Sequence, residues 1–226
     1  MRDLSPVLPN GRRLQPRQFE YHPTRADRMI IGTMSGELAV LNPRVEDAAD
    51  ALVASWQSQQ NDMVLGLTWM RRQNFNNKFI AGSDDGSIRM HDVNRMKKGK
   101  GPVHAYKDFK QLTALHSNSL DEKFIVSGYS NDVALYDIES GSRLNVFPEL
   151  HEDQHINVLK FANRHPHLFA TCSFDCTVKL WDLREKVVKE NALFVKRSSK
   201  GTVMVCFSDD DKYLLRYNFA VCSIFL

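Results

Sequence analysis

The sequence has no apolar run long enough to span a membrane. A transmembrane helix needs about 20 predominantly apolar residues, and no stretch approaching that length occurs. The first residues, MRDLSPVLPNGRR, also lack the apolar core of a secretory signal peptide. We therefore expect no membrane partner and a location in the nucleus, the cytoplasm or both.

Cysteine is scarce, and its spacing matches no common metal or redox motif. The four cysteines, which form no CxxC pair, are Cys172, Cys176, Cys206 and Cys222. Thiols stay reduced in the nucleus and cytosol, so disulfides are not expected. Cys172 and Cys176 lie inside an apolar strand-turn-strand pattern, and we interpret them as small core residues. The sequence predicts no metal and no cofactor.

The chain also lacks a dominant charge of either sign. It has 30 basic and 27 acidic residues among 226, for a net charge of +3, and 42% of the residues are hydrophobic. This composition supports a substantial core and favours no particular partner. The N-terminal segment is basic, which fits either a solvated face or a phosphate-binding patch. Its arginines are Arg2, Arg12, Arg13, Arg17, Arg25 and Arg28.

Motifs that would indicate catalysis are missing or misplaced. The stretch from Gly82 to Gly86 reads GSDDG, and two adjacent carboxylates would repel a bound phosphate. His151–His155 spells H-E-x-x-H, but zinc-protease chemistry needs that motif on a helix, with both histidines on one face. Pro148 lies just upstream and an apolar strand pattern starts at Ile156, so no helix is expected. We predict a protein that is not an enzyme, with no catalytic residues.

Four segments of the chain repeat one pattern. They cover residues 19–42, 65–92, 112–137 and 156–182. Their closing dipeptides are Leu41-Asn42, His91-Asp92, Tyr136-Asp137 and Trp181-Asp182, at spacings of 50, 45 and 45 residues. A period of about 40–45 residues that closes on Trp-Asp is typical of a β-propeller blade.

Alternating apolar positions separated by turn residues favour short antiparallel strands within each repeat. The fold class expected is all-β, an incomplete propeller of about four blades plus the start of a fifth. Residues 1–11 are expected to be a tail and 12–215 the partial propeller, followed by an atypical tail over 216–226. The repeats are placed near 12–56, 63–97, 111–150, 151–197 and 201–215.

Two segments are harder to assign. VEDAADALVASW has helical as well as strand spacing, and the repeat register favours a strand over Leu52–Trp56 after an acidic loop. Val203–Leu215 begins a fifth repeat, but the RYNFAVCSIFL that follows does not match one. An open sheet edge is unusual for a propeller, which suggests a truncated or variant form of a longer protein.

The stretch Phe169–Arg184, FATCSFDCTVKLWDLR, resembles the repeat of the WD-repeat family. The resemblance implies a structural hydrogen-bonded set of His, Ser or Thr, Asp and Trp. Carried over, these residues are His151, Ser173, Asp175 and Trp181. Ser83 and Asp85 match in the second repeat, where His91 replaces Trp. The full set is therefore expected in the fourth repeat.

The same stretch resembles the box found in substrate receptors of cullin-4-type ubiquitin ligases, which ends Trp-Asp-x-Arg. The resemblance implies that Asp175, Trp181, Asp182 and Arg184 dock on the ligase's damaged-DNA-binding-protein adaptor, and that the receptor also binds a protein substrate. HINVLKFANRHPHLFATCSFDCTVKLWDLR looks most similar to plant proteins of this class linked to UV-B responses. The first repeat has a partial match at Arg44.

Two interpretations of this motif stay open. Arg184 can be an ordinary solvated arginine, because the same spacing occurs in WD-repeat proteins outside ligases. The chain would then be a scaffold of another nuclear or cytosolic complex, with nucleic acid as a partner of the basic N-terminal segment.

Overall fold

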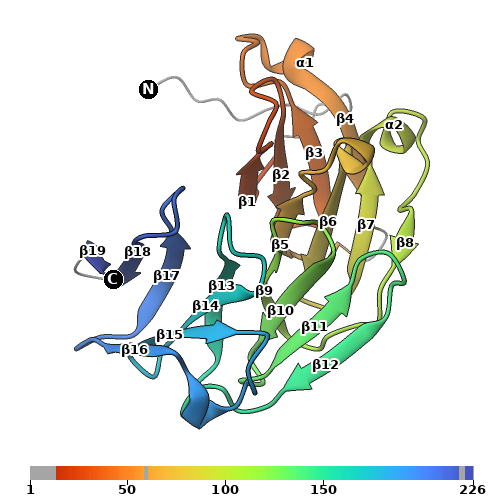
Figure 1. Ribbon diagram of the computed structural model, residues 1–226. Coiled ribbons are helices and arrows are strands. Elements are labelled where there is room, and N and C mark those ends of the chain that lie inside the picture. Colours follow the sequence, from red (N-terminus) through yellow and green to blue (C-terminus); the bar gives the residue numbers. More distant parts are fainter. Residues whose placement is uncertain (1–13, 59–60, 219–221, 226) are drawn as a thin grey trace. The chain divides into compact units, whose positions relative to one another are not determined.

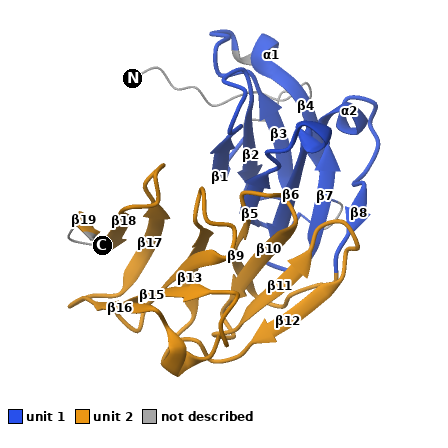
Figure 2. Ribbon diagram, viewed as in Figure 1, with its two compact units in different colours: residues 1–106 blue, residues 107–226 orange. Residues whose placement is uncertain are grey.

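A computed structural model describes residues 14–58, 61–218 and 222–225, and it divides the chain into two compact units. Unit 1 covers residues 1–106 and unit 2 covers residues 107–226 (Figure 2). Each sheet is an antiparallel meander of strands that follow one another along the chain. Among the described residues, no helix has the length and apolar character needed to cross a membrane.

Unit 1 contains two four-stranded sheets (Figure 1). The first consists of β1 (Pro16–Tyr21), β2 (Met29–Thr33), β3 (Glu37–Leu41) and β4 (Leu52–Gln57). The second consists of β5 (Val64–Trp69), β6 (Lys78–Ser83), β7 (Ile88–Asp92) and β8 (His104–Ala105). Three single helical turns connect strands within these sheets: α1 (Ala48–Ala51), η1 (Gln73–Phe75) and α2 (Val93–Met96).

Unit 2 contains two more four-stranded sheets and one of three strands. The third sheet has β9 (Leu112–Ser117), β10 (Lys123–Gly128), β11 (Val133–Asp137) and β12 (Arg143–Phe147). The fourth has β13 (Ile156–Phe161), β14 (Leu168–Ser173), β15 (Thr177–Asp182) and β16 (Phe194–Arg197), with η2 (Lys189–Asn191) before β16. The fifth has β17 (Thr202–Phe207), β18 (Leu214–Asn218) and β19 (Cys222–Phe225).

Within each unit, the first strand of one sheet lies beside the first strand of the next. β5 follows β1 in this way, β13 follows β9, and β17 follows β13. Side chains that alternate along the strands fill the space between neighbouring sheets. Ile30 and Phe79 belong to one such core in unit 1, and Phe161 and Trp181 to another in unit 2. The sheets therefore pack face to face, as blades of a propeller do.

The expected fold class, an all-β incomplete propeller of about four blades and part of a fifth, is confirmed. The strand expected over Leu52–Trp56 forms as β4. The acidic loop expected before it is instead one turn of helix, because Asp47 accepts hydrogen bonds from Asp50 and Ala51 at the start of that turn.

The chain after Leu215 was expected to lie outside the repeats. Residues 216–218 instead complete β18, and residues 222–225 form β19, which pairs with it. The sequence there departs from the repeat consensus but keeps β-prone residues at alternate positions, which is enough for strand pairing. The expected N-terminal tail over 1–11 lies outside the described residues.

Candidate functional site

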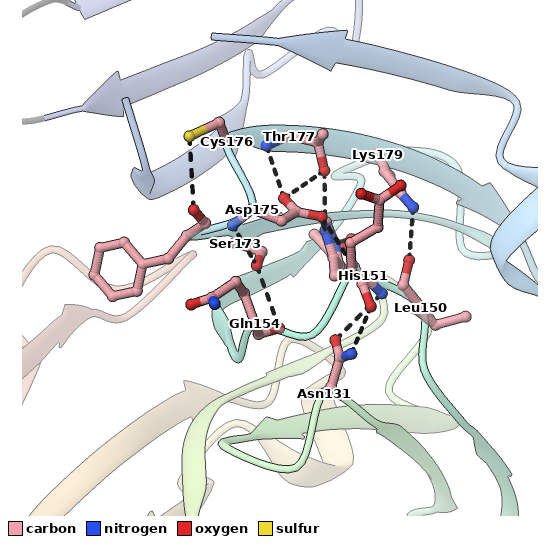
Figure 3. Close-up of polar contacts among 12 residues, drawn as sticks. Asn131, Leu150, His151, Gln154, Ser173, Asp175, Cys176, Thr177 and Lys179 are labelled. Atoms are coloured by element: carbon pink, nitrogen blue, oxygen red, sulfur yellow. Dashed lines mark hydrogen bonds and ion pairs between the residues drawn. The ribbon is translucent and has the colours of Figure 1, made fainter. Parts of the chain in front are cut away.

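The fourth sheet, called the fourth blade below, carries a buried chain of hydrogen-bonded side chains, and Figure 3 shows its part around His151 and Asp175. Trp181 Nε1–H donates to Thr171 Oγ1 over 2.9 Å, and Thr171 Oγ1 lies 2.7 Å from His151 Nε2. His151 Nδ1 lies 2.8 Å from Asp175 Oδ2. All four side chains are almost completely removed from solvent. The chain joins the core at Trp181 to the β14–β15 turn at Asp175.

The donors and acceptors fix the protons of this chain. A hydroxyl has one hydrogen to donate and two acceptor lone pairs. His151 Nδ1 faces the Asp175 carboxylate, which only accepts, so Nδ1 carries the proton and donates to Asp175. Nε2 of the neutral imidazole then accepts, so Thr171, which accepts from the indole, donates its own hydrogen to Nε2. Every buried polar atom of these four side chains has a partner, which is the condition for such a network to stabilise a core.

Ionisation of the pair follows from its surroundings. Burial lowers the pKa of His151 below its ordinary value, and the Asp175 carboxylate opposes this shift only in part. The imidazole is therefore neutral at pH 7. Burial alone would raise the pKa of Asp175, but hydrogen bonds from His151 and Thr177 lower it well below its usual range. Asp175 stays ionised and holds the turn.

Local geometry explains why the turn has this shape. Asp175 Oδ1 accepts from the backbone N–H of Thr177 at 2.8 Å and from its hydroxyl at 2.7 Å, an Asx-type turn. Cys176 lies between them in the left-handed region with φ of 67°. The corresponding residues in the first two blades are Gly36 and Gly86, also with positive φ. This position therefore strains a side chain such as that of Cys176.

The predicted set and the observed chain differ at one residue. Sequence reasoning selected Ser173, but Ser173 Oγ contacts Gln154 O at 3.4 Å and accepts from the backbone N–H of Asp175. Thr171 takes the place between His151 and Trp181. The two residues lie on the same face of β14 because side chains alternate along a strand, and the ring of His151 reaches the inner one. Strand alternation marks Thr171 as a second candidate hydroxyl beside Ser173, but it does not choose between the two.

Lys179 is another residue that sequence reasoning missed. It is 5% exposed, its Nζ donates to Leu150 O at 2.8 Å, and it lies 5.7 Å from the centroid of the Trp181 ring. Burial lowers its pKa, and Asp175 opposes that shift. The ammonium therefore ties the segment before β13 to the indole.

The second blade keeps only part of this arrangement. Ser87 N–H donates to Asp85 Oδ1 at 2.8 Å, and Ser83 and Ser87 hydroxyls lie 2.9 Å apart. Ala81 replaces Thr171 and His91 replaces Trp181 in the strand register. His91 Nδ1 is buried and has no hydrogen-bond partner among the described residues. In the part of the chain that the structure describes, the complete four-residue chain occurs only in the fourth blade.

The Trp-Asp-x-Arg motif ends at the opposite end of β15 from the Asp175 turn. Asp182 is almost buried, whereas the side chain of Arg184 is 68% exposed. The Asp182 carboxylate accepts from the backbone N–H of Arg184 at 2.9 Å, from its Nε at 3.0 Å and from its Nη2 at 2.6 Å. The hydrogen bonds to Arg184 lower the pKa of Asp182. The guanidinium is thus held in one orientation at an exposed edge.

The partial motif of the first blade lacks this pairing of a carboxylate with a guanidinium. Arg44 N–H donates to Asn42 Oδ1 at 3.1 Å, so the backbone makes the same turn. An amide cannot replace the carboxylate that pairs with the guanidinium in the fourth blade. Of the two motifs, only the one at Asp182 fixes its arginine side chain.

The H-E-x-x-H motif does not form a helix. Its first four residues are bends, and the imidazole of His151 is used in the buried chain. Among the described residues, no group of His, Cys, Asp and Glu side chains could hold a metal ion. Burial raises the pKa of the Cys172 thiol to about 12, which fits a core residue.

The repeated sheets and the hydrogen-bonded side chains of the fourth blade indicate the class of protein. The family described as "WD domain, G-beta repeat" matches residues 51–92 and 141–182, which end at the closing Asp of the second and fourth repeats. The chain therefore contains WD40 repeats.

Several known proteins are similar to this chain over most of its length. It is 46% identical over 211 residues to protein DWD HYPERSENSITIVE TO UV-B 1 of Arabidopsis thaliana, which covers 90% of this chain and 26% of that protein. It is 24% identical over 201 residues to DNA damage-binding protein 2 of Mus musculus, covering 86% and 43%. It is 26% identical over 200 residues to DDB1- and CUL4-associated factor 10 of Mus musculus, covering 80% and 34%. The chain thus spans about a quarter to less than half of the length of these relatives.

Proposed function

We propose that this chain is part of a substrate receptor of a cullin-4-type ubiquitin ligase. It acts as a non-catalytic scaffold in the nucleus or cytoplasm, docks on the damaged-DNA-binding-protein adaptor, and presents a protein substrate for ubiquitylation. The observation that carries the proposal is the exposed guanidinium of Arg184, which the nearly buried carboxylate of Asp182 holds in place.

The chemistry of this fork suits docking. A guanidinium offers planar paired hydrogen bonds to a carboxylate or to backbone carbonyls of a partner. Because Asp182 fixes the side chain before binding, less conformational entropy is lost when a partner engages it. Trp181 and Asp175 contribute indirectly, since they hold β15 and its turn in register.

The names of the relatives support the same assignment. One relative is a DDB1- and CUL4-associated factor, and another carries the DWD designation together with hypersensitivity to UV-B. Both are similar to this chain over most of its length. The motif and the relatives therefore both support a role as a substrate receptor.

The test is direct binding of the purified chain to the purified adaptor, measured by co-precipitation and by titration calorimetry. Wild type is expected to bind, and Arg184→Ala to weaken binding about tenfold or more, as loss of an interfacial arginine commonly does. Arg184→Lys is expected to restore only part of the affinity, because it keeps the charge and loses the fork.

Arg164→Ala is the matched control. Arg164 is also an exposed arginine of the fourth blade, with its side chain 61% exposed and 2.8 Å from Asp209. Its removal changes the charge as Arg184→Ala does and should leave adaptor binding unchanged. The proposal fails if wild type does not bind the adaptor, or if Arg184→Ala and Arg164→Ala have the same effect.

A further inference from the structure

One end of the second blade gathers an unusual number of cationic side chains. Seven of them and a single carboxylate, Asp92, belong to two segments. These are residues 70–78, the β5–β6 connection with the first residue of β6, and residues 92–101, the last residue of β7 with most of the connection to β8. Their net charge is +6, whereas the whole chain has +3, so the remaining residues are net acidic. We call these seven residues the basic surface: Arg71, Arg72, Lys78, Arg95, Lys97, Lys98 and Lys100.

The two connections meet in space. Lys78 and Asp92 are paired residues of β6 and β7, and Val93 N–H donates to Asn77 O at 2.9 Å. Figure 1 shows α2, which lies in the second connection, directly after β7. Arg25 also contacts this region, since its Nη1 donates to Asn77 Oδ1 at 3.1 Å, but its guanidinium is paired with Asp27 at 3.2 Å and is not counted in the basic surface. The charges therefore add up over one surface of unit 1.

The lysines of the second segment are not neutralised within the described part of the protein. The carboxylate of Asp92 is engaged at the start of α2, where it accepts from the backbone N–H groups of Asn94 and Arg95. Lys97, Lys98 and Lys100 are exposed and form no ion pair among the described residues. Clustered like charges of this kind repel one another unless an anionic partner covers them.

Uncharged residues of the first connection indicate which polyanion fits. The segment reads RRQNFNNK, so four amides and one aromatic ring lie between its two arginines and its lysine. Lys78 Nζ lies 4.8 Å from the centroid of the Phe75 ring. Arginine and lysine bind phosphates, Asn and Gln side chains bind phosphate and sugar oxygens, and aromatic rings stack on bases. An acidic peptide would use the cations but not the ring.

We propose that the basic surface binds the sugar-phosphate backbone of nucleic acid, without reading base sequence. This binding is separate from adaptor docking, since it involves a different blade and a different unit. It differs also from the N-terminal patch considered above, because its cations belong to the second blade.

Fluorescence anisotropy with labelled duplex and single-stranded oligonucleotides of random sequence tests the proposal across a series of KCl concentrations. For wild type, the logarithm of the affinity should fall linearly with the logarithm of salt, by about 0.9 per duplex phosphate contacted. The variant Lys97→Glu/Lys98→Glu/Lys100→Glu should weaken binding by about tenfold or more and reduce the slope by up to about 2.7.

The control changes the net charge equally in unit 2, at three exposed lysines, as Lys186→Glu/Lys189→Glu/Lys196→Glu. It should bind nucleic acid with the wild-type salt slope. Circular dichroism checks that both variants keep the wild-type fold. The proposal is overturned if wild type does not bind, if both triple variants lose affinity equally, or if a glutamate-rich peptide binds the wild-type surface more tightly than either oligonucleotide.

Discussion

Removing the hydroxyl of Thr171 is the sharpest test of the buried hydrogen-bonded side chains in the fourth blade. Thr171→Val keeps the size and shape of the side chain and removes only the hydrogen-bonding group. It leaves Trp181 Nε1–H and His151 Nε2 buried without partners, since both bond this oxygen at 2.9 and 2.7 Å. Each unsatisfied buried group costs about 1–3 kcal/mol, so we expect the free energy of unfolding to fall by about 2–6 kcal/mol.

The measurement is equilibrium urea unfolding followed by circular dichroism, with the free energy taken from the midpoint and the slope. A double-mutant cycle with Trp181→Phe isolates the link, because the second substitution removes the donor that Thr171→Val leaves unpaired. The double variant should be less destabilised than the sum of the single variants by about 1–2 kcal/mol.

Ser173→Ala is the matched control, since Ser173 lies on the same face of the same strand but bonds neither His151 nor Trp181. It should cost about 1 kcal/mol and show no coupling to Trp181→Phe. Additive effects in the Thr171 cycle, or coupling in the Ser173 cycle, would refute the assignment of Thr171.

Three further outcomes follow from the packing. Burial lowers the pKa of His91 to about 3, so the unfolded chain binds a proton at this residue that the folded chain does not. His91 alone should therefore lower the free energy of unfolding by about 2 kcal/mol between pH 7 and pH 5, and His91→Phe should reduce the pH dependence by that amount while the contribution of the buried His151 stays. Gly32→Ala should cost about 1–3 kcal/mol in urea unfolding because its Cβ would lie 2.4 Å from a methyl carbon of the buried Val64, whereas Gly101→Ala, with no atom within 4 Å, should be close to neutral. Cys176→Gly should raise the melting temperature, by an amount equivalent to about 1 kcal/mol, because it relieves the left-handed backbone at φ of 67°, and an unchanged or lower melting temperature would argue against strain there.

Much of the fold was accessible from the sequence because the repeat imposes its own register. Alternating apolar residues and turn residues at fixed offsets indicated the strands of the fourth blade, including β14 and β15. The helical turn α1 and strand β19 were missed for a local reason. A capping aspartate and a β-prone tail decide those elements, and neither follows the repeat pattern.

The site was predictable to a smaller extent. Consensus residues identified His151, Asp175 and Trp181, which the structure brings together. Consensus alone could not choose between Thr171 and Ser173, because both are hydroxyl residues on one face of a strand. The choice depends on how far the His151 ring reaches from a separate segment, which is a tertiary distance. The basic surface likewise needs the fold, since its two connections are separated in the sequence.

The proposed adaptor docking at Arg184 can be tested most directly by hydrogen–deuterium exchange of the protein with and without the purified adaptor. The account predicts protection of backbone amides in residues 183–188, which follow Asp182, and no change in residues 151–155 at the other end of the blade. The protection should be lost in Arg184→Ala and kept in Arg164→Ala. Protection confined to residues 151–155, or an exchange pattern that the adaptor does not alter, would contradict the account.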